Sequence, residues 1–153
     1  MNITKAQKII FNALLTNNYP VRRFDFDEDN VFITPDGYRG FIIPYSALQV
    51  NIDKMQTVKP IDISSVVKEE NLFSLTRELL LQEHPKALLR KLTNGERNVF
   101  INSKYIECFQ NPRFYQKEKN QMVVVTEDIS ATRKNMIVGI ILPVRVAEDL
   151  YKT

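Results

Sequence analysis

The sequence predicts an α+β domain in which two helices lie on one face of an antiparallel sheet. Two segments with helical spacing of apolar residues, near 5–16 and 103–110, are each followed by strand-like segments. Both series of elements end on the same pattern, which is a glycine, three large apolar residues and a proline, at 40–44 and 139–143. The shared order of elements indicates two similar halves within one domain.

The spacing within the two halves supports this internal repeat. Lys5 and Gly40 are separated by 35 residues, and Ser103 and Gly139 by 36. A repeat of this kind predicts a pseudo-twofold arrangement, with one helix from each half. The predicted single domain spans residues 1–153, as two halves (1–44 and 98–146) and a connecting segment (45–97).

Composition is that of an ordinary globular chain, with 153 residues, 44% of them hydrophobic and 25% charged. The longest apolar run, Met136 to Val144, is interrupted by Gly139 and Pro143 and is too short for a membrane span. Cys108 is the only cysteine, so an intrachain disulfide is impossible. The amino-terminal residues lack the apolar core of a secretory signal. We expect a cytoplasmic protein without a membrane partner.

The first third reads as a short strand at 1–3, a helix and three strands. Thr4 and Gln7 have the spacing of a capping box, which predicts where the helix begins. Apolar residues then recur at helical intervals, at Ala6, Ile9, Ile10, Ala13 and Leu14. The predicted strands are Val21–Phe26, Val31–Thr34 and Tyr38–Ile43, with turns at 27–30 and 35–37.

The connecting segment contains two leucine-rich stretches, 72–82 and 87–92, on either side of His84 and Pro85. Their leucines fit helical spacing, and they also alternate as in a strand. A long hairpin and a pair of short helices both remain open, and the pattern slightly favours the hairpin.

The last third predicts a strand at 98–101, then a helix that buries Tyr105, Ile106 and Phe109. Two strands follow, at 122–126 and 136–142, separated by a polar loop. The tail from Ala147 to Thr153 is expected to fray.

Three pieces of this last third carry a recognisable pattern: the strand-to-helix segment Val99–Ile106, the strand Met122–Asp128 and the apolar ending Ile141–Arg145. Together they resemble the final domain of bacterial DNA sliding clamps. It covers 98–146, and extends to 1–44 by order of elements alone. A clamp chain carries three such domains, so a ring built from this chain would require several copies, and a homo-oligomer is one expectation.

The resemblance implies two binding sites. Sliding clamps hold duplex DNA through basic helix residues without reading bases, and the net charge of +3 permits such contact. The corresponding nucleic-acid-binding residues are Lys5, Lys8, Lys104, Arg113 and Lys117. Clamps also bind partner peptides in a groove near the carboxyl terminus. The corresponding residues are Leu142, Pro143, Val144 and Arg145.

Catalytic signatures are not apparent. His84 and Cys108 form the only conceivable nucleophile pair, and their contexts are typical of a turn residue and a core residue. The acidic cluster from Asp25 to Asp29 lacks calcium-loop spacing. We therefore expect no catalytic residue, metal or cofactor.

The predicted function is a non-catalytic clamp-like binding protein in DNA replication or metabolism, contacting DNA or replication proteins. The alternative is a protein-interaction or regulatory module of the same fold without DNA binding.

Overall fold

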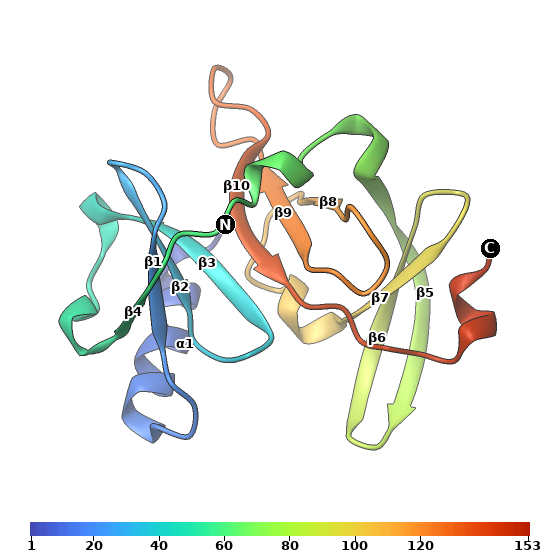
Figure 1. Ribbon diagram of the computed structural model, residues 1–153, viewed down its shortest axis with the longest axis horizontal. Helices are drawn as coiled ribbons and strands as arrows, with labels where there is room; N and C mark the ends of the chain where they lie inside the picture. The colour runs from blue at the N-terminus through green and yellow to red at the C-terminus, as the bar shows by residue number, and fades with distance from the viewer.

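The structure is a computed structural model that describes residues 1–153 as one ten-stranded sheet with a single α-helix (Figure 1). The strand order is β4-β1-β2-β3-β10-β9-β8-β5-β6-β7, and every neighbouring pair is antiparallel except β1 and β4. The elements are α1 (Ile3–Thr16), β1 (Arg22–Asp25), β2 (Asn30–Thr34), β3 (Arg39–Pro44), β4 (Gln56–Val58), β5 (Leu72–Glu83), β6 (Lys86–Thr93), β7 (Asn98–Asn102), β8 (Arg113–Tyr115), β9 (Val123–Glu127) and β10 (Met136–Ile141). Short 3₁₀ helices complete the chain: η1 (Tyr45–Ala47), η2 (Ile52–Lys54), η3 (Ser64–Val66), η4 (Glu69–Asn71), η5 (Ser103–Ile106) and η6 (Glu148–Tyr151).

Helix α1 confirms the first predicted helix and corrects its start. Asn2, not Thr4, is the N-cap, because its side-chain oxygen accepts the Lys5 N–H at 3.0 Å. The short strand predicted at 1–3 is therefore wrong. Asn17 ends the helix in the left-handed conformation, with its N–H donating to the Ala13 carbonyl at 3.0 Å. Ala6 and Ile10 are fully buried, as the apolar stripe predicts.

The second predicted helix is wrong. The segment after β7 forms only the four-residue 3₁₀ helix η5, where the Asn102 side chain caps the Lys104 N–H at 3.0 Å. Asn111, in the left-handed conformation with a φ of 47°, and Pro112 after it prevent the segment from continuing as a helix. The Cys108 carbonyl instead accepts the Asn2 N–H at 2.8 Å. The clamp-like fold with two helices on one sheet face is thus overturned by a ten-stranded mixed sheet with one helix.

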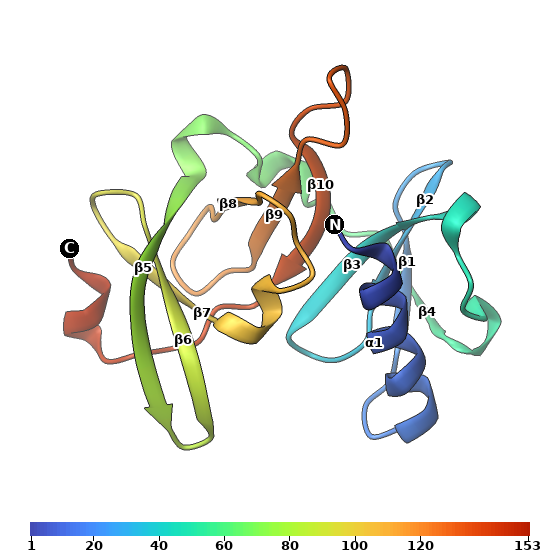
Figure 2. The ribbon, with the colours of Figure 1, turned by 180° about the vertical axis from the view of Figure 1, so that it is seen from behind.

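The two leucine-rich stretches form the long hairpin of β5 and β6. Leu80 pairs with Leu89 and Leu81 with Leu88, and a turn at His84 and Pro85 joins the strands. The hairpin projects from the rest of the molecule in both views (Figures 1 and 2).

The two glycine-containing strands meet at the centre of the sheet. Gly139 of β10 pairs with Phe41 of β3, and Ile140 pairs with Gly40. On either side of this pair, β2 and β1 follow β3 while β9 and β8 follow β10. This junction joins the amino-terminal third to the carboxyl-terminal third by backbone pairing.

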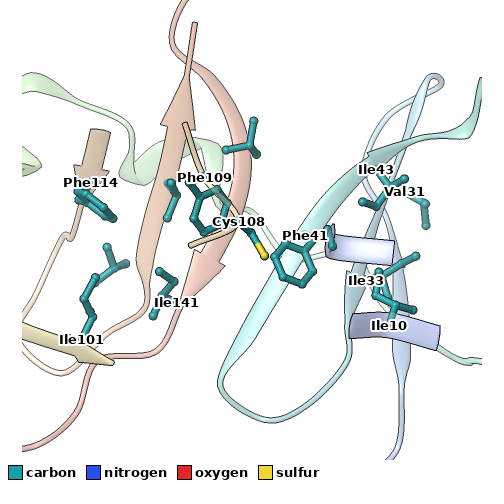
Figure 3. Close-up of a cluster of buried hydrophobic side chains, with 14 of the residues drawn as sticks. Ile10, Val31, Ile33, Phe41, Ile43, Ile101, Cys108, Phe109, Phe114 and Ile141 are labelled. Atoms are coloured by element: carbon teal, nitrogen blue, oxygen red, sulfur yellow. The ribbon is translucent and has the colours of Figure 1, made fainter. Parts of the chain in front are cut away.

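Two hydrophobic clusters cover the two faces of the sheet. Successive residues of β9 alternate between them, since Val123 and Val125 belong to the larger cluster and Val124 to the smaller one. The larger cluster, 19 residues, spans both halves, and Figure 3 shows Cys108 and Phe109 facing Phe41. The main core therefore forms across the β3–β10 junction.

The carboxyl-terminal tail packs against β7 and does not fray as expected. The Asn98 amide donates to the carbonyls of Leu150 and Lys152 at 2.9 and 3.0 Å, and Tyr151 is buried. The tail thereby covers part of the sheet edge formed by β7. Helix α1, with 14 residues, is neither long nor apolar enough to cross a membrane.

Candidate functional site

A cleft of about 900 Å³ opens beside the loop that joins β9 to β10, which rises at the top of Figure 1. Its lining comes from both halves of the chain: the β1–β2 turn, the end of β3, the start of β8 and the β9–β10 loop all contribute. Nine of its 20 lining residues are hydrophobic, including Phe26, Ile42 and Ile137. Mixed lining and concave shape are features of ligand-binding sites.

An ion pair lies at one side of the cleft. Arg113 of β8 donates from its two terminal nitrogens to the two carboxylate oxygens of Asp128, at 2.9 and 3.0 Å. These hydrogen bonds, together with the Asn135 backbone N–H, lower the pKa of Asp128 to about 2. Asp128 therefore stays ionised through the physiological pH range and is poorly suited to act as a general acid.

Asn135 holds the base of the β9–β10 loop. Its backbone has a φ of 53°, in the left-handed region, and its N–H donates to Asp128 Oδ1 at 2.8 Å. Its side-chain oxygen accepts hydrogen bonds from Thr126 Oγ1 at 2.6 Å and Tyr115 Oη at 3.1 Å. The loop is thus anchored on β8 and β9 by one asparagine.

Glu127 is a buried carboxylate in the cleft lining, with only 2% of its surface exposed. One oxygen pairs with the amino group of Met1, and the other accepts the Gln110 N–H at 2.6 Å. A buried carboxylate needs such partners, because an unpaired one would cost several kcal/mol. Both of its oxygens therefore already have donors from the protein.

Arg133 differs from the other charged residues of the cleft. Asp27 accepts the backbone N–H groups of Asp29 and Asn30, each at 2.8 Å, so this carboxylate too is occupied within its own turn. The Arg133 backbone takes part in the loop's hydrogen bonds, but its guanidinium makes neither an ion pair nor a hydrogen bond. It is the one charged side chain lining the cleft without a partner.

The residues predicted to bind DNA lie in three places. Lys8 is exposed on α1 and Lys104 on η5. The two elements are neighbours, as the ion pair between Lys5 Nζ and Glu107 at 3.2 Å shows. Arg113 instead lies in the cleft, paired with Asp128. Lys117 lies in the β8–β9 loop, beside a smaller hollow. The structure therefore brings three of the five residues together and separates two.

The predicted groove residues, 142–145, form an extended segment after β10. The Leu142 N–H donates to the Tyr38 carbonyl and the Val144 N–H donates to the Phe100 carbonyl, each at 2.8 Å. None of residues 142–145 lines the main cleft. The segment crosses from the β3 side of the molecule to β7, held by its backbone.

The suggested cysteine–histidine pair does not form. Cys108 is buried in the main core, and this burial raises the pKa of its thiol. His84 is exposed at the tip of the β5–β6 hairpin. No three His, Cys, Asp or Glu side chains come together where they could hold one metal ion.

Sequence reasoning missed Arg133, Asn135 and Glu127 as parts of one site. The available signal was the polar loop before a β-branched strand, where an asparagine is the residue best able to adopt positive φ. The position of these residues in the sequence does not show which other strands the β9–β10 loop lies against. No protein-family model, curated protein sequence or solved structure matches this chain.

Proposed function

We propose that this protein is a non-catalytic binding protein whose ligand occupies the cleft beside the β9–β10 loop. The ligand carries an anionic group on an apolar body. The observation that carries this proposal is the free guanidinium of Arg133, on the rim of a cleft whose carboxylates all have donors already.

The chemistry of the lining supports this ligand class. The Arg133 guanidinium offers donors suited to a carboxylate, sulfonate or phosphate. Phe26, Ile42 and Ile137 offer apolar surface within the same cleft. The volume of about 900 Å³ falls within the ~300–1,000 Å³ typical of small-molecule sites.

A binding role also fits the state of the ionisable groups. A general acid or base works best with a pKa near the working pH, whereas the pKa of Asp128 is lowered to about 2. The Cys108 thiol is buried with a raised pKa, which disfavours the reactive thiolate. A free buried thiol also agrees with the proposed cytoplasmic location.

The test uses 8-anilinonaphthalene-1-sulfonate, a fluorescent probe with an apolar body and one sulfonate. Titration of the full chain should show one site. Arg133→Gln should weaken binding by about tenfold or more, because a hydrogen bond between charged groups is removed. Lys134→Gln is the matched control, since it removes the same charge from the adjacent residue, which does not line the cleft.

The two variants separate a site from general charge attraction. Equal weakening by Arg133→Gln and Lys134→Gln would contradict the proposal, as would unchanged binding in both. Circular dichroism of each variant checks that the probe reports on folded protein, because this probe also binds partly unfolded states.

Contact with the DNA backbone is the second candidate. It is favoured by the placement of Lys5, Lys8 and Lys104 on the adjoining segments α1 and η5, although Glu107 offsets part of their charge. Binding to duplex DNA should then be independent of sequence and should weaken as salt rises. Replacing the three lysines by glutamine should flatten the slope of log affinity against log salt by at most about 2.7. Absence of duplex binding at low salt would end this candidate.

A further inference from the structure

Strand β5 has a long backbone edge with no neighbouring strand. Only Leu72 and Phe73 pair with β8, whereas pairing with β6 continues to Glu83. In an antiparallel pair, alternate residues direct their N–H and C=O groups away from the partner strand. Between Leu75 and Leu79 the strand is irregular, and there the Thr76 carbonyl accepts from Arg90 and the Glu78 N–H donates to Thr76 Oγ1. Beyond this stretch, the outer edge of β5 presents unpaired backbone groups, which form a template for another strand.

The other two edges of the sheet, at β4 and β7, leave fewer backbone groups open to another strand. Strand β4 has three residues. At β7, the carboxyl-terminal segment lies alongside, through the Val144 N–H to the Phe100 carbonyl and a bridge between Arg97 and Lys152. The projecting part of β5 is the longest stretch without such cover (Figure 2).

One face of the hairpin carries three exposed leucines among charged side chains. Leu79 and Leu81 lie on the same face of β5, and Leu88 stands opposite Leu81 on β6. Their exposed fractions are 56%, 50% and 44%, respectively. A two-stranded ribbon with exposed leucines is marginally stable in water by itself. A further strand added at the open edge would pair its backbone groups and place new side chains beside the leucines on the same face.

The sequence of β5 is complementary to itself in one antiparallel register. With the two-fold axis at Leu80, Leu79 of one copy lies opposite Leu81 of the other, on the face that carries both leucines in each copy. The same register places Arg77 opposite Glu83 at both ends. Arg77 and Glu83 are exposed and make no ion pair within their own chain, although Lys86 stands opposite Glu83 on β6. Residues 79–83 of this register lie beyond the irregularity between Leu75 and Leu79, and Arg77 lies within it.

We propose that two copies of this chain associate through β5, antiparallel about a two-fold axis at Leu80. The partner is a second copy because an isologous contact satisfies both open edges at once, and because the free charges at 77 and 83 match only in this arrangement. The paired hairpins join the exposed leucines of both copies into one apolar face. This inference does not rest on the ligand proposed for the cleft.

The test is the molar mass of the full chain in solution, by sedimentation or light scattering from about 1 μM to about 500 μM. The mass should rise with concentration from 17.8 kDa toward twice that value. Arg77→Glu should raise the dissociation constant about tenfold or more, because by symmetry two attractive contacts become repulsive. The double variant Arg77→Glu with Glu83→Arg should return the dissociation constant to within about threefold of that of the parent chain.

Controls make each outcome decisive. Leu15→Gln replaces a leucine that is 67% exposed on α1, away from the hairpin, and should leave the mass unchanged. Circular dichroism checks that each variant folds, and the substituted hairpin positions are exposed. A chain that stays monomeric throughout overturns the proposal. So does a dimer insensitive to Arg77→Glu, or one that the charge exchange fails to restore.

Discussion

Gly139 lies where β10 passes against β3 and the ring of Phe109. A Cβ atom placed there would lie 2.6 Å from the Gly40 carbonyl oxygen and 2.9 Å from Phe109 Cζ. The backbone oxygen cannot move aside without disturbing the pairing of the two strands. The glycine is therefore required by close approach of the backbones, which its place in an apolar run does not by itself reveal.

Gly139→Ala is expected to destabilise the protein by about 1–3 kcal/mol, the usual cost of overpacking a core. Urea unfolding followed by circular dichroism measures this free energy. Gly95→Asn is the control, because Gly95 has a φ of 91° with open space around it and asparagine tolerates positive φ. The control should change stability by about 0.5 kcal/mol or less. Equal midpoints for Gly139→Ala and the parent chain would contradict the packing described.

At the scale of elements, β10 illustrates a strand that sequence alone identifies well. It is apolar on both faces, and it lies between β3 and β9 with Val138, Ile140 and Ile141 buried. Continuous apolar character is what a central strand covered on both faces requires. Ile141, the last residue of this strand, is 0% exposed.

Ile141→Ala should cost about 2–5 kcal/mol, because it leaves a cavity in the larger core cluster. A shift of the denaturation midpoint measures the loss. Ile61→Ala is the matched control, since Ile61 is 44% exposed outside the helices and strands, and it should cost about 1 kcal/mol or less. Comparable losses in the two variants would show that Ile141 does not pack as described.

The segment after β7 shows where element prediction fails. Tyr105, Ile106 and Phe109 have helical spacing and all contact the main core, yet only one 3₁₀ turn forms. Spacing reports which side chains are buried, whereas helix length depends on the backbone partners at each end. Here Asn2 supplies a partner for the Cys108 carbonyl from the other half of the chain.

At the scale of the whole molecule, the two halves share one core. The rings of Phe41 and Phe109 lie in contact, with centroids 6.2 Å apart and planes tilted by 41°. Strands β3 and β10 pair the backbones of the two halves. Neither half can keep its buried surface without the other. This coupling predicts cooperative behaviour of the entire chain.

Unfolding by urea should therefore follow a single transition. Circular dichroism and tyrosine fluorescence should give the same midpoint, since the chain has no tryptophan and its six tyrosines lie in both halves. Gly139→Ala should shift both signals equally. Two separate transitions, or midpoints that differ between the probes, would show that the halves unfold independently.

Local sequence patterns determined much of the fold. Helix α1, strands β1 to β3, and strands β7, β9 and β10 follow from apolar periodicity and turn residues, which act over a few neighbouring residues. The β5–β6 hairpin was one of two readings that the leucines allowed, and strand pairing decided between them.

The tertiary structure alone decided the site and the architecture. Arg133, Asp128 and Arg113 are charged residues of ordinary appearance in the sequence, and they line one cleft because β8 pairs with β9 and the β9–β10 loop follows directly. The open edge of β5 likewise exists only because β8, which runs antiparallel to β5, begins no earlier than Arg113. Periodicity reports burial along one segment, but contacts between distant segments depend on strand order, and no local pattern in this chain encodes that order.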